Sequence, residues 1–126
     1  MSDIKFLLIE DEPLIAEAIA AVMERNHFVV SAIVYSKEDA FEHLNTHFPD
    51  MVLLDINLNG QMDGIEIAEK INKQYNIPFI FITSCSDKHT LEKAKFTEPS
   101  GFIVKPFNDS GLYSTLEIAL HNHPKK

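Results

Sequence analysis

Cysteine, basic side chains and long apolar runs are scarce in this sequence, and each scarcity excludes a class of protein. The single cysteine, Cys85, excludes an intramolecular disulfide and fits a reducing compartment. Only 11 Lys and Arg stand against 19 Asp and Glu, so we expect no direct binding of nucleic acid or of an anionic membrane. No apolar run approaches the length that spans a bilayer, and the first residues lack the features of a signal peptide. We therefore expect a soluble domain in the cytoplasm.

The length and the apolar content fit one domain that spans residues 1–126. With 45% apolar residues, the chain can bury a substantial core. Five short runs rich in Ile, Val, Leu and Phe predict β-strands, and they cover residues 4–9, 28–34, 51–54, 78–82 and 101–104. The third and fourth runs are nearly continuous rather than alternating, which is typical of strands that are covered on both faces.

Segments with apolar residues at helical spacing separate these runs, and they cover residues 13–26, 37–47, 64–75, 87–96 and 109–122. Ser36 is placed to cap the second of these helices. In the fourth, only Leu91, Ala94 and Phe96 could face a core, so we expect this helix to be the most easily displaced. Five repeats of strand and helix predict right-handed crossovers and an α/β fold with a doubly wound, five-stranded parallel sheet.

Polar residues follow four of the predicted strands where each strand stops, and they are Glu10, Asp11, Asp55, Thr83 and Lys105. Ligands of open α/β sheets bind beyond the carboxyl ends of the strands, so these side chains should converge in one crevice. Packed carboxylates repel one another, so the cluster needs a cation. Asp11 and Asp55 suit Mg²⁺, and Glu10 could ligate directly or through water. The backbone carbonyl of Asn57 could complete the set.

Phosphoryl acceptance is the chemistry that this set of residues supports. The carboxylate of Asp55 would attack an electrophilic phosphorus and form an acyl phosphate. A bound metal would neutralise the charge that develops on the phosphoryl oxygens. The hydroxyl of Thr83 and the ammonium of Lys105 would donate hydrogen bonds to those oxygens. Positioning and electrostatics would then account for most of the catalysis.

At this level of detail the sequence resembles the receiver domain of two-component response regulators over essentially its whole length. The motifs that carry the resemblance are Ile-Glu-Asp-Glu-Pro, Leu-Leu-Asp-Ile-Asn-Leu, Ile-Thr-Ser and Val-Lys-Pro-Phe, in this order. The resemblance implies a flavodoxin-like (βα)5 fold with strand order 2-1-3-4-5. It also implies that a sensor histidine kinase or a histidine phosphotransfer protein donates a phosphoryl group to Asp55. The metal would be Mg²⁺, with Mn²⁺ as a substitute, held by Glu10, Asp11, Asp55 and the Asn57 carbonyl.

The resemblance carries further implications for the switch. Phe102 occupies the family's switch position, and the residues at Asn57 and Cys85 tune the lifetime of the acyl phosphate. Phosphorylation would draw the Thr83 hydroxyl inward and vacate space beneath the fourth helix, which an aromatic side chain can fill. The surface of the fourth helix, fifth strand and last helix would then change. The Lys105–Pro106 bond would be cis, as in relatives.

The resemblance also bears on the protein's place in signalling. The domain would not be a conventional enzyme, although it would catalyse its own aspartyl phosphorylation and dephosphorylation. The segments 59–64 and 93–101 resemble a subgroup whose members often carry LytTR-type or sensor-kinase modules. A C-terminal output domain absent from this chain is therefore an open expectation. A homodimer is a second open expectation.

Three alternatives remain open at the level of sequence. A haloacid-dehalogenase-like phosphohydrolase places its nucleophile early as Asp-x-Asp and its acidic pair late, whereas here the pair comes first. A flavodoxin-like flavin carrier needs a hydroxyl- and glycine-rich loop for phosphate, which the acidic segment 10–12 would repel. A phosphorylation-independent interaction module on the same fold is the third. The six histidines share no ligand spacing with Cys85, and we expect them to be solvated.

Overall fold

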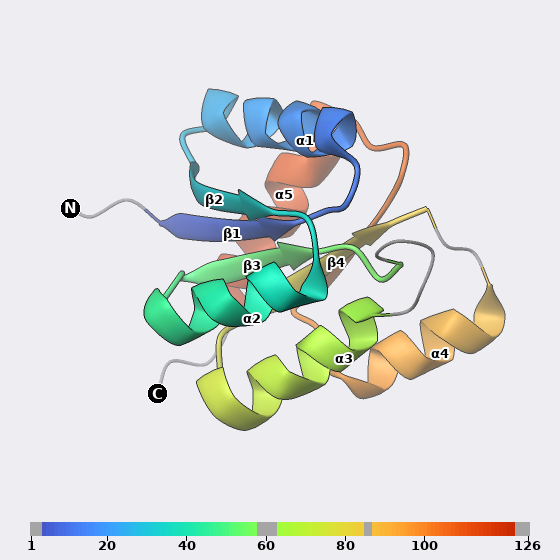
Figure 1. Ribbon diagram of the computed structural model, residues 1–126. Coiled ribbons are helices and arrows are strands. Elements are labelled where there is room, and N and C mark those ends of the chain that lie inside the picture. The colour runs from blue at the N-terminus through green and yellow to red at the C-terminus, as the bar shows by residue number, and fades with distance from the viewer. Residues whose placement is uncertain (1–3, 58–62, 85–86, 123–126) are drawn as a thin grey trace.

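A single parallel sheet organises the computed structural model, which describes residues 4–57, 63–84 and 87–122 (Figure 1). The strands are β1 (Lys5–Ile9), β2 (Val29–Val34), β3 (Met51–Leu54), β4 (Phe79–Thr83) and β5 (Gly101–Val104). Their order in the sheet is β2-β1-β3-β4-β5, and every neighbouring pair is parallel. The predicted doubly wound α/β fold with order 2-1-3-4-5 is confirmed.

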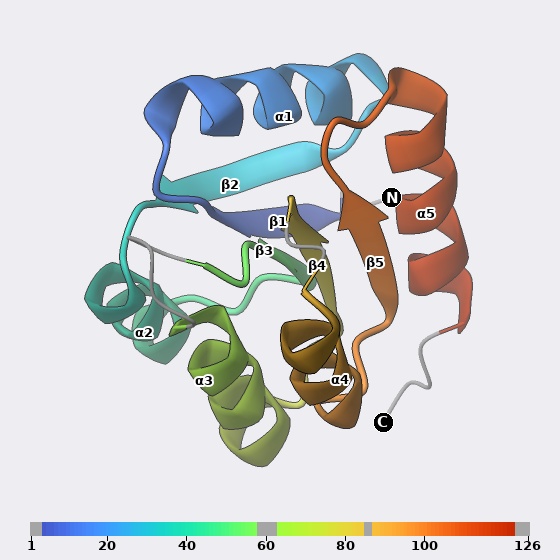
Figure 2. The same cartoon turned by 90° about the vertical axis from the view of Figure 1, so that its right-hand side faces the viewer.

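Helices cover both faces of the sheet (Figure 2). They are α1 (Pro13–Arg25), α2 (Lys37–Thr46), α3 (Asp63–Lys70), α4 (Lys88–Phe96) and α5 (Asp109–Asn122). Helices α1 and α5 pack on one face, and α2, α3 and α4 pack on the other. The predicted helix at 64–75 is divided, because its second half is a π-helix, η1 (Ile71–Tyr75). Within the described residues, none of the helices is both long and apolar enough to cross a membrane.

The central strands explain why their apolar runs are continuous. In β1, Phe6 and Leu8 pack against α1 and α5, whereas Leu7 and Ile9 pack into the opposite cluster. All four side chains are fully buried. Side chains of a strand alternate between the two faces of the sheet, so a strand covered on both faces needs apolar residues at every position.

Two local features place the chain around the carboxyl edge of the sheet. Ser36 caps α2 as predicted, since its hydroxyl oxygen accepts a hydrogen bond of 3.1 Å from the Asp39 N–H. Gly64, in the first turn of α3, approaches the end of β3 so closely that a Cβ there would lie 2.1 Å from the Asp55 carbonyl oxygen. Only glycine allows this approach, so α3 begins directly against the segment that carries Asp55.

Helix α4 buries few side chains, as its sequence suggested. Its buried residues are Thr90 and Ala94, and Leu91 is half-buried. The expectation that Phe96 could face the core is wrong, because this side chain is 84% exposed. Successive helical residues are about 100° apart, so Phe96 points away from the side on which Ala94 is buried. Two small side chains supply little apolar burial, which supports an easily displaced helix.

Candidate functional site

The carboxyl ends of four neighbouring strands bring the predicted site residues to one edge of the sheet. Glu10 follows β1, Asp55 follows β3, Thr83 ends β4 and Lys105 follows β5. Two backbone hydrogen bonds extend the strand register past the strand ends. The N–H of Asp55 donates to the Ile9 carbonyl at 3.0 Å, and the N–H of Lys105 donates to the Thr83 carbonyl at 2.9 Å. The strand register therefore sets the relative positions of these residues.

Lys105 binds two of the carboxylates directly. Its Nζ lies 2.8 Å from Glu10 Oε1 and 3.3 Å from Asp55 Oδ2. The Glu10 side chain is fully buried, and the side chains of Asp55 and Lys105 are 8% and 13% exposed. These charges interact in a poorly hydrated crevice, where each of them depends on the others.

The acidic residues form a cluster with the donor set of a hard-metal site. Glu10, Asp11 and Asp55 each offer one carboxylate oxygen, and these oxygens all lie within 4.8 Å of one another. Local turns orient two of the carboxylates. The Asn57 N–H donates to Asp55 Oδ1 at 3.1 Å, and the Glu12 N–H donates to Glu10 Oε2 at 3.3 Å. Three carboxylates beside one ammonium leave an excess of negative charge that a divalent cation would neutralise.

The electrostatics of the pair Glu10 and Lys105 follow from this crowding. Burial raises the pKa of Glu10 from its ordinary 4.5 to about 7; the hydrogen bond from Lys105 opposes this effect, and the charge of Asp55 adds to it. Burial works against the charge of Lys105, but the hydrogen bond and charge of Glu10, together with Asp55, leave its pKa raised overall. Lys105 is therefore a permanent cation at neutral pH, whereas Glu10 is poised between its two forms.

The residues predicted to sense the phosphoryl group occupy the two strands beside the acidic cluster. Thr83 is buried at the last position of β4 and pairs in register with Val104, the residue before Lys105. Phe102 is half-buried on β5, and its ring centroid lies 6.0 Å from that of Phe81. The Lys105–Pro106 bond is cis, as the resemblance implied. Cys85 lies outside the described residues, so its role stays a prediction.

Sequence reasoning missed a cleft beside the crevice. It has a volume of about 520 Å³ and lies between the start of α1 and the segment after β5. Its lining includes Glu12, Leu14, Ser84, Lys105 and Phe107. Leu14 is 82% exposed. The position of Leu14 could have revealed the cleft, because this apolar residue lies on α1 outside the buried stripe that contains Ala16 and Ile19.

One histidine departs from the expectation of full solvation. His43 is half-buried, and its ring stacks on that of His47 with centroids 4.3 Å apart. Burial, followed by the charge of His47, lowers the pKa of His43. Both residues belong to α2 and its C-cap, and neither follows a strand end that forms the crevice.

Comparison with known proteins identifies the family. Residues 6–117 match the model of the response regulator receiver domain. The heme response regulator HssR of Staphylococcus saprophyticus is 28% identical over 117 residues, which are 93% of this chain and 51% of that protein. The transcriptional regulatory protein PdtaR of Mycobacterium tuberculosis is 28% identical over 116 residues, 92% of this chain and 56% of that protein. The chain thus spans about half the length of these curated relatives.

Solved structures agree with the sequence match. The signal receiver domain of a modulated diguanylate cyclase from Desulfovibrio desulfuricans is 32% identical, with a TM-score of 0.88 and 97% coverage of both chains. The N-terminal domain of a response regulator/sensory box/GGDEF protein from Carboxydothermus hydrogenoformans is 29% identical, with a TM-score of 0.83, and covers 93% of this chain and 94% of that chain. These matches favour a receiver over a haloacid-dehalogenase-like hydrolase, a flavin carrier or a phosphorylation-independent module. The chain belongs to the response regulator receiver domain family of two-component systems.

Proposed function

We propose that this receiver domain accepts a phosphoryl group on Asp55 in a reaction that depends on Mg²⁺. The observation that supports the proposal is the crevice itself. Carboxylate oxygens of Glu10, Asp11 and Asp55 lie within 4.8 Å of one another, and the Nζ of Lys105 lies 3.3 Å from Asp55. An acidic cluster beside a single ammonium suits a metal-assisted transfer of an anionic group to a carboxylate.

The donor set fits a hard divalent cation. Asp11 and Asp55 would hold Mg²⁺ directly, Glu10 directly or through water, and the Asn57 backbone carbonyl would add an oxygen ligand. Mn²⁺ prefers similar oxygen ligands and would substitute. When bound, the metal would neutralise charge on the phosphoryl oxygens.

The side chains of this chain would divide the remaining work. The Asn57 N–H, 3.1 Å from Asp55 Oδ1, orients the attacking carboxylate, so that the other oxygen, Oδ2, is directed toward Lys105. Lys105 would donate a charge-assisted hydrogen bond to the phosphoryl group on Asp55. Thr83 would donate its hydroxyl to another phosphoryl oxygen. The domain would thereby catalyse its own phosphorylation and dephosphorylation without acting as a conventional enzyme.

The donor would be the phosphohistidine of a sensor histidine kinase or of a histidine phosphotransfer protein. The cleft of about 520 Å³ beside Lys105 supports direct docking of such a partner, because it opens beside the exposed apolar side chain of Leu14. Phosphorylation would shift α4 and the strand that carries Phe102, and so change the surface of α4, β5 and α5. A C-terminal output domain would respond to this change.

Residues 1–126 would act as one domain. The two core clusters pack on opposite faces of one sheet and share β1, β3 and β4. No part of the described chain forms a separate core, so the crevice and the α4 surface belong to one cooperative unit.

Incubation with Mg²⁺ and acetyl phosphate tests the proposal. Intact mass should show one added phosphoryl group that is labile, absent from Asp55→Asn and absent when EDTA is present. Asp39→Asn, at an exposed carboxylate on α2, is the matched control and should accept the group normally. An adduct that persists in Asp55→Asn would refute the assignment. Repeated turnover of phosphate monoesters would instead indicate a hydrolase.

A further inference from the structure

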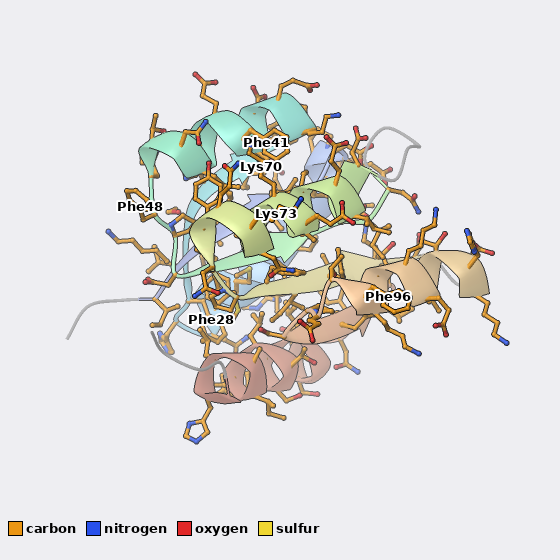
Figure 3. The ribbon with its side chains drawn as sticks, turned by 90° about the horizontal axis from the view of Figure 1, so that it is seen from below. Phe28, Phe41, Phe48, Lys70, Lys73 and Phe96 are labelled. Carbon is orange, nitrogen blue, oxygen red and sulfur yellow. The ribbon has the colours of Figure 1, made fainter. Side chains whose placement is uncertain are left out.

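Phe96 is a large apolar side chain that the fold does not use. It is 84% exposed at the C-terminal end of α4, and Figure 3 shows it on the outer side of that helix. An isolated exposed aromatic is ordinary on a protein surface. Phe96, however, borders a groove of about 500 Å³ between α3 and α4, which we call the α3–α4 groove. The residues that line it are Ile65, Glu66 and Glu69 from α3 and Lys93 and Phe96 from α4.

The charges on the two walls of the groove differ in whether they are already paired. Glu66 is held by Lys37 at 3.2 Å, on the side of α3 that faces α2. Neither Glu69 nor Lys93 has an ion-pair partner within 4.0 Å among the residues that the structure describes. The groove therefore presents an available carboxylate on its α3 wall and an available ammonium on its α4 wall, next to an exposed phenyl ring.

We propose that the α3–α4 groove is the contact surface of a homodimer. A two-fold axis makes the same patch meet itself, so a patch that carries both members of each complementary pair is self-complementary. Phe96 of each copy would enter the groove of the other and pack against Ile65. Lys93 of each copy would meet Glu69 of the other, which gives two reciprocal ion pairs.

The overall charge of the chain makes this local complementarity necessary. At a net charge of −8, two copies repel each other unless opposite charges face one another at the contact. The α4 wall offers a cation where the partner's α3 wall offers an anion. Because one aromatic anchor per copy makes a small interface, the dimer should be reversible and should form above roughly 100 µM.

Sedimentation velocity of the metal-free, unphosphorylated chain tests the dimer from about 10 µM to about 1 mM. These conditions exclude any contribution from the proposed phosphorylation. The wild type should shift from monomer to dimer, and Phe96→Ala should weaken association at least tenfold. Phe48→Ala is the matched control, because Phe48 is 77% exposed but follows α2, away from the groove (Figure 3). A wild type that stays monomeric at the highest concentration, or a Phe96→Ala variant that still dimerises, would overturn the proposal.

Charge reversal identifies the partner as a second copy. Lys93→Glu puts carboxylates on both walls, and Glu69→Lys puts ammonium groups on both walls, so each variant alone should stay monomeric. A 1:1 mixture of the two should associate, because every ion pair is then restored between unlike copies. The double variant should also dimerise by itself. Glu69 and Lys93 are exposed residues of α3 and α4, and unchanged circular dichroism would verify that the variants fold. A mixture that remains monomeric would refute the two-fold contact.

Discussion

Replacing Glu10 with glutamine should stabilise the metal-free domain at alkaline pH and have little effect at acidic pH. The carboxylate is fully buried, and its burial, with the nearby charge of Asp55, raises its pKa to about 7. Glutamine keeps the shape of the side chain and removes the charge. The variant therefore isolates the electrostatic cost of holding Glu10 ionised in the crevice without a metal.

The sign and size of the effect follow from the two pKa values of Glu10. The pKa of the folded state, about 7, is above the ordinary value of 4.5, so the folded state binds the proton more tightly. Below about pH 4.5 the carboxyl is neutral in both states and has no electrostatic cost. Above about pH 7 it is ionised in both, and a difference of about 2.5 between the pKa values corresponds to about 3 kcal/mol. The domain should lose that stability as the pH rises through this window.

Urea unfolding in EDTA at about pH 5 and about pH 8 measures the effect, with far-ultraviolet circular dichroism as the probe because the chain has no Trp. The stability difference between Glu10→Gln and wild type should be larger at the higher pH by about 2–3 kcal/mol. Glu12→Gln is the control, because Glu12 is exposed. An equal difference at both pH values would refute the reasoning. Mg²⁺ should stabilise the wild type more than the variant, since a neutral amide is a weaker ligand for the cation than a carboxylate.

Three further outcomes follow from the packing. Gly64→Ala would place a Cβ 2.1 Å from the Asp55 carbonyl oxygen and should lower the free energy of unfolding by about 3 kcal/mol, measured in urea; unchanged stability would contradict the close approach. Ser36→Ala removes the N-cap hydroxyl that accepts a hydrogen bond from the Asp39 N–H, and it should lower the free energy of unfolding by about 1 kcal/mol in the same assay. Amides of α4 should exchange with solvent faster than those of α1 in hydrogen-exchange mass spectrometry, because only Thr90 and Ala94 are buried in α4; equal protection would argue against an easily displaced helix.

The fold and the crevice could be predicted because both depend on order along the chain. Strands with apolar residues on both faces belong to the centre of a parallel sheet, and their carboxyl ends must meet at one edge. Once the runs at β1, β3 and β5 are assigned to strands, the positions of Glu10, Asp55 and Lys105 at the carboxyl edge follow. In the structure, Lys105 Nζ lies 2.8 Å from Glu10, which is 95 residues away in sequence, and 3.3 Å from Asp55, which is 50 residues away.

Other features depend on contacts between helices, which periodicity does not encode. The π-helix after α3 is tied to the end of α4, since the Asn72 side-chain amide donates to the Thr97 carbonyl at 2.6 Å. That contact joins segments whose relative position is set by the sheet, not by their own residues. The exposure of Phe96 depends on which side of α4 faces the sheet. Thr90, Ala94 and Thr97 are the buried residues of this region, and Phe96 lies on another side of the helix.

The crevice and the α3–α4 groove can therefore be altered independently of each other. Glu10 interacts with Asp55 and Lys105 inside the crevice, so changing it alters stability, metal affinity and chemistry together. Phe96 is 84% exposed, so truncating it removes almost no buried surface and should leave the fold and the crevice intact. Sites without shared contacts have additive effects on free energy. Combining Glu10→Gln with Phe96→Ala should therefore reproduce the stability of the first and the monomeric state of the second, and a non-additive result would show that α4 couples the two surfaces.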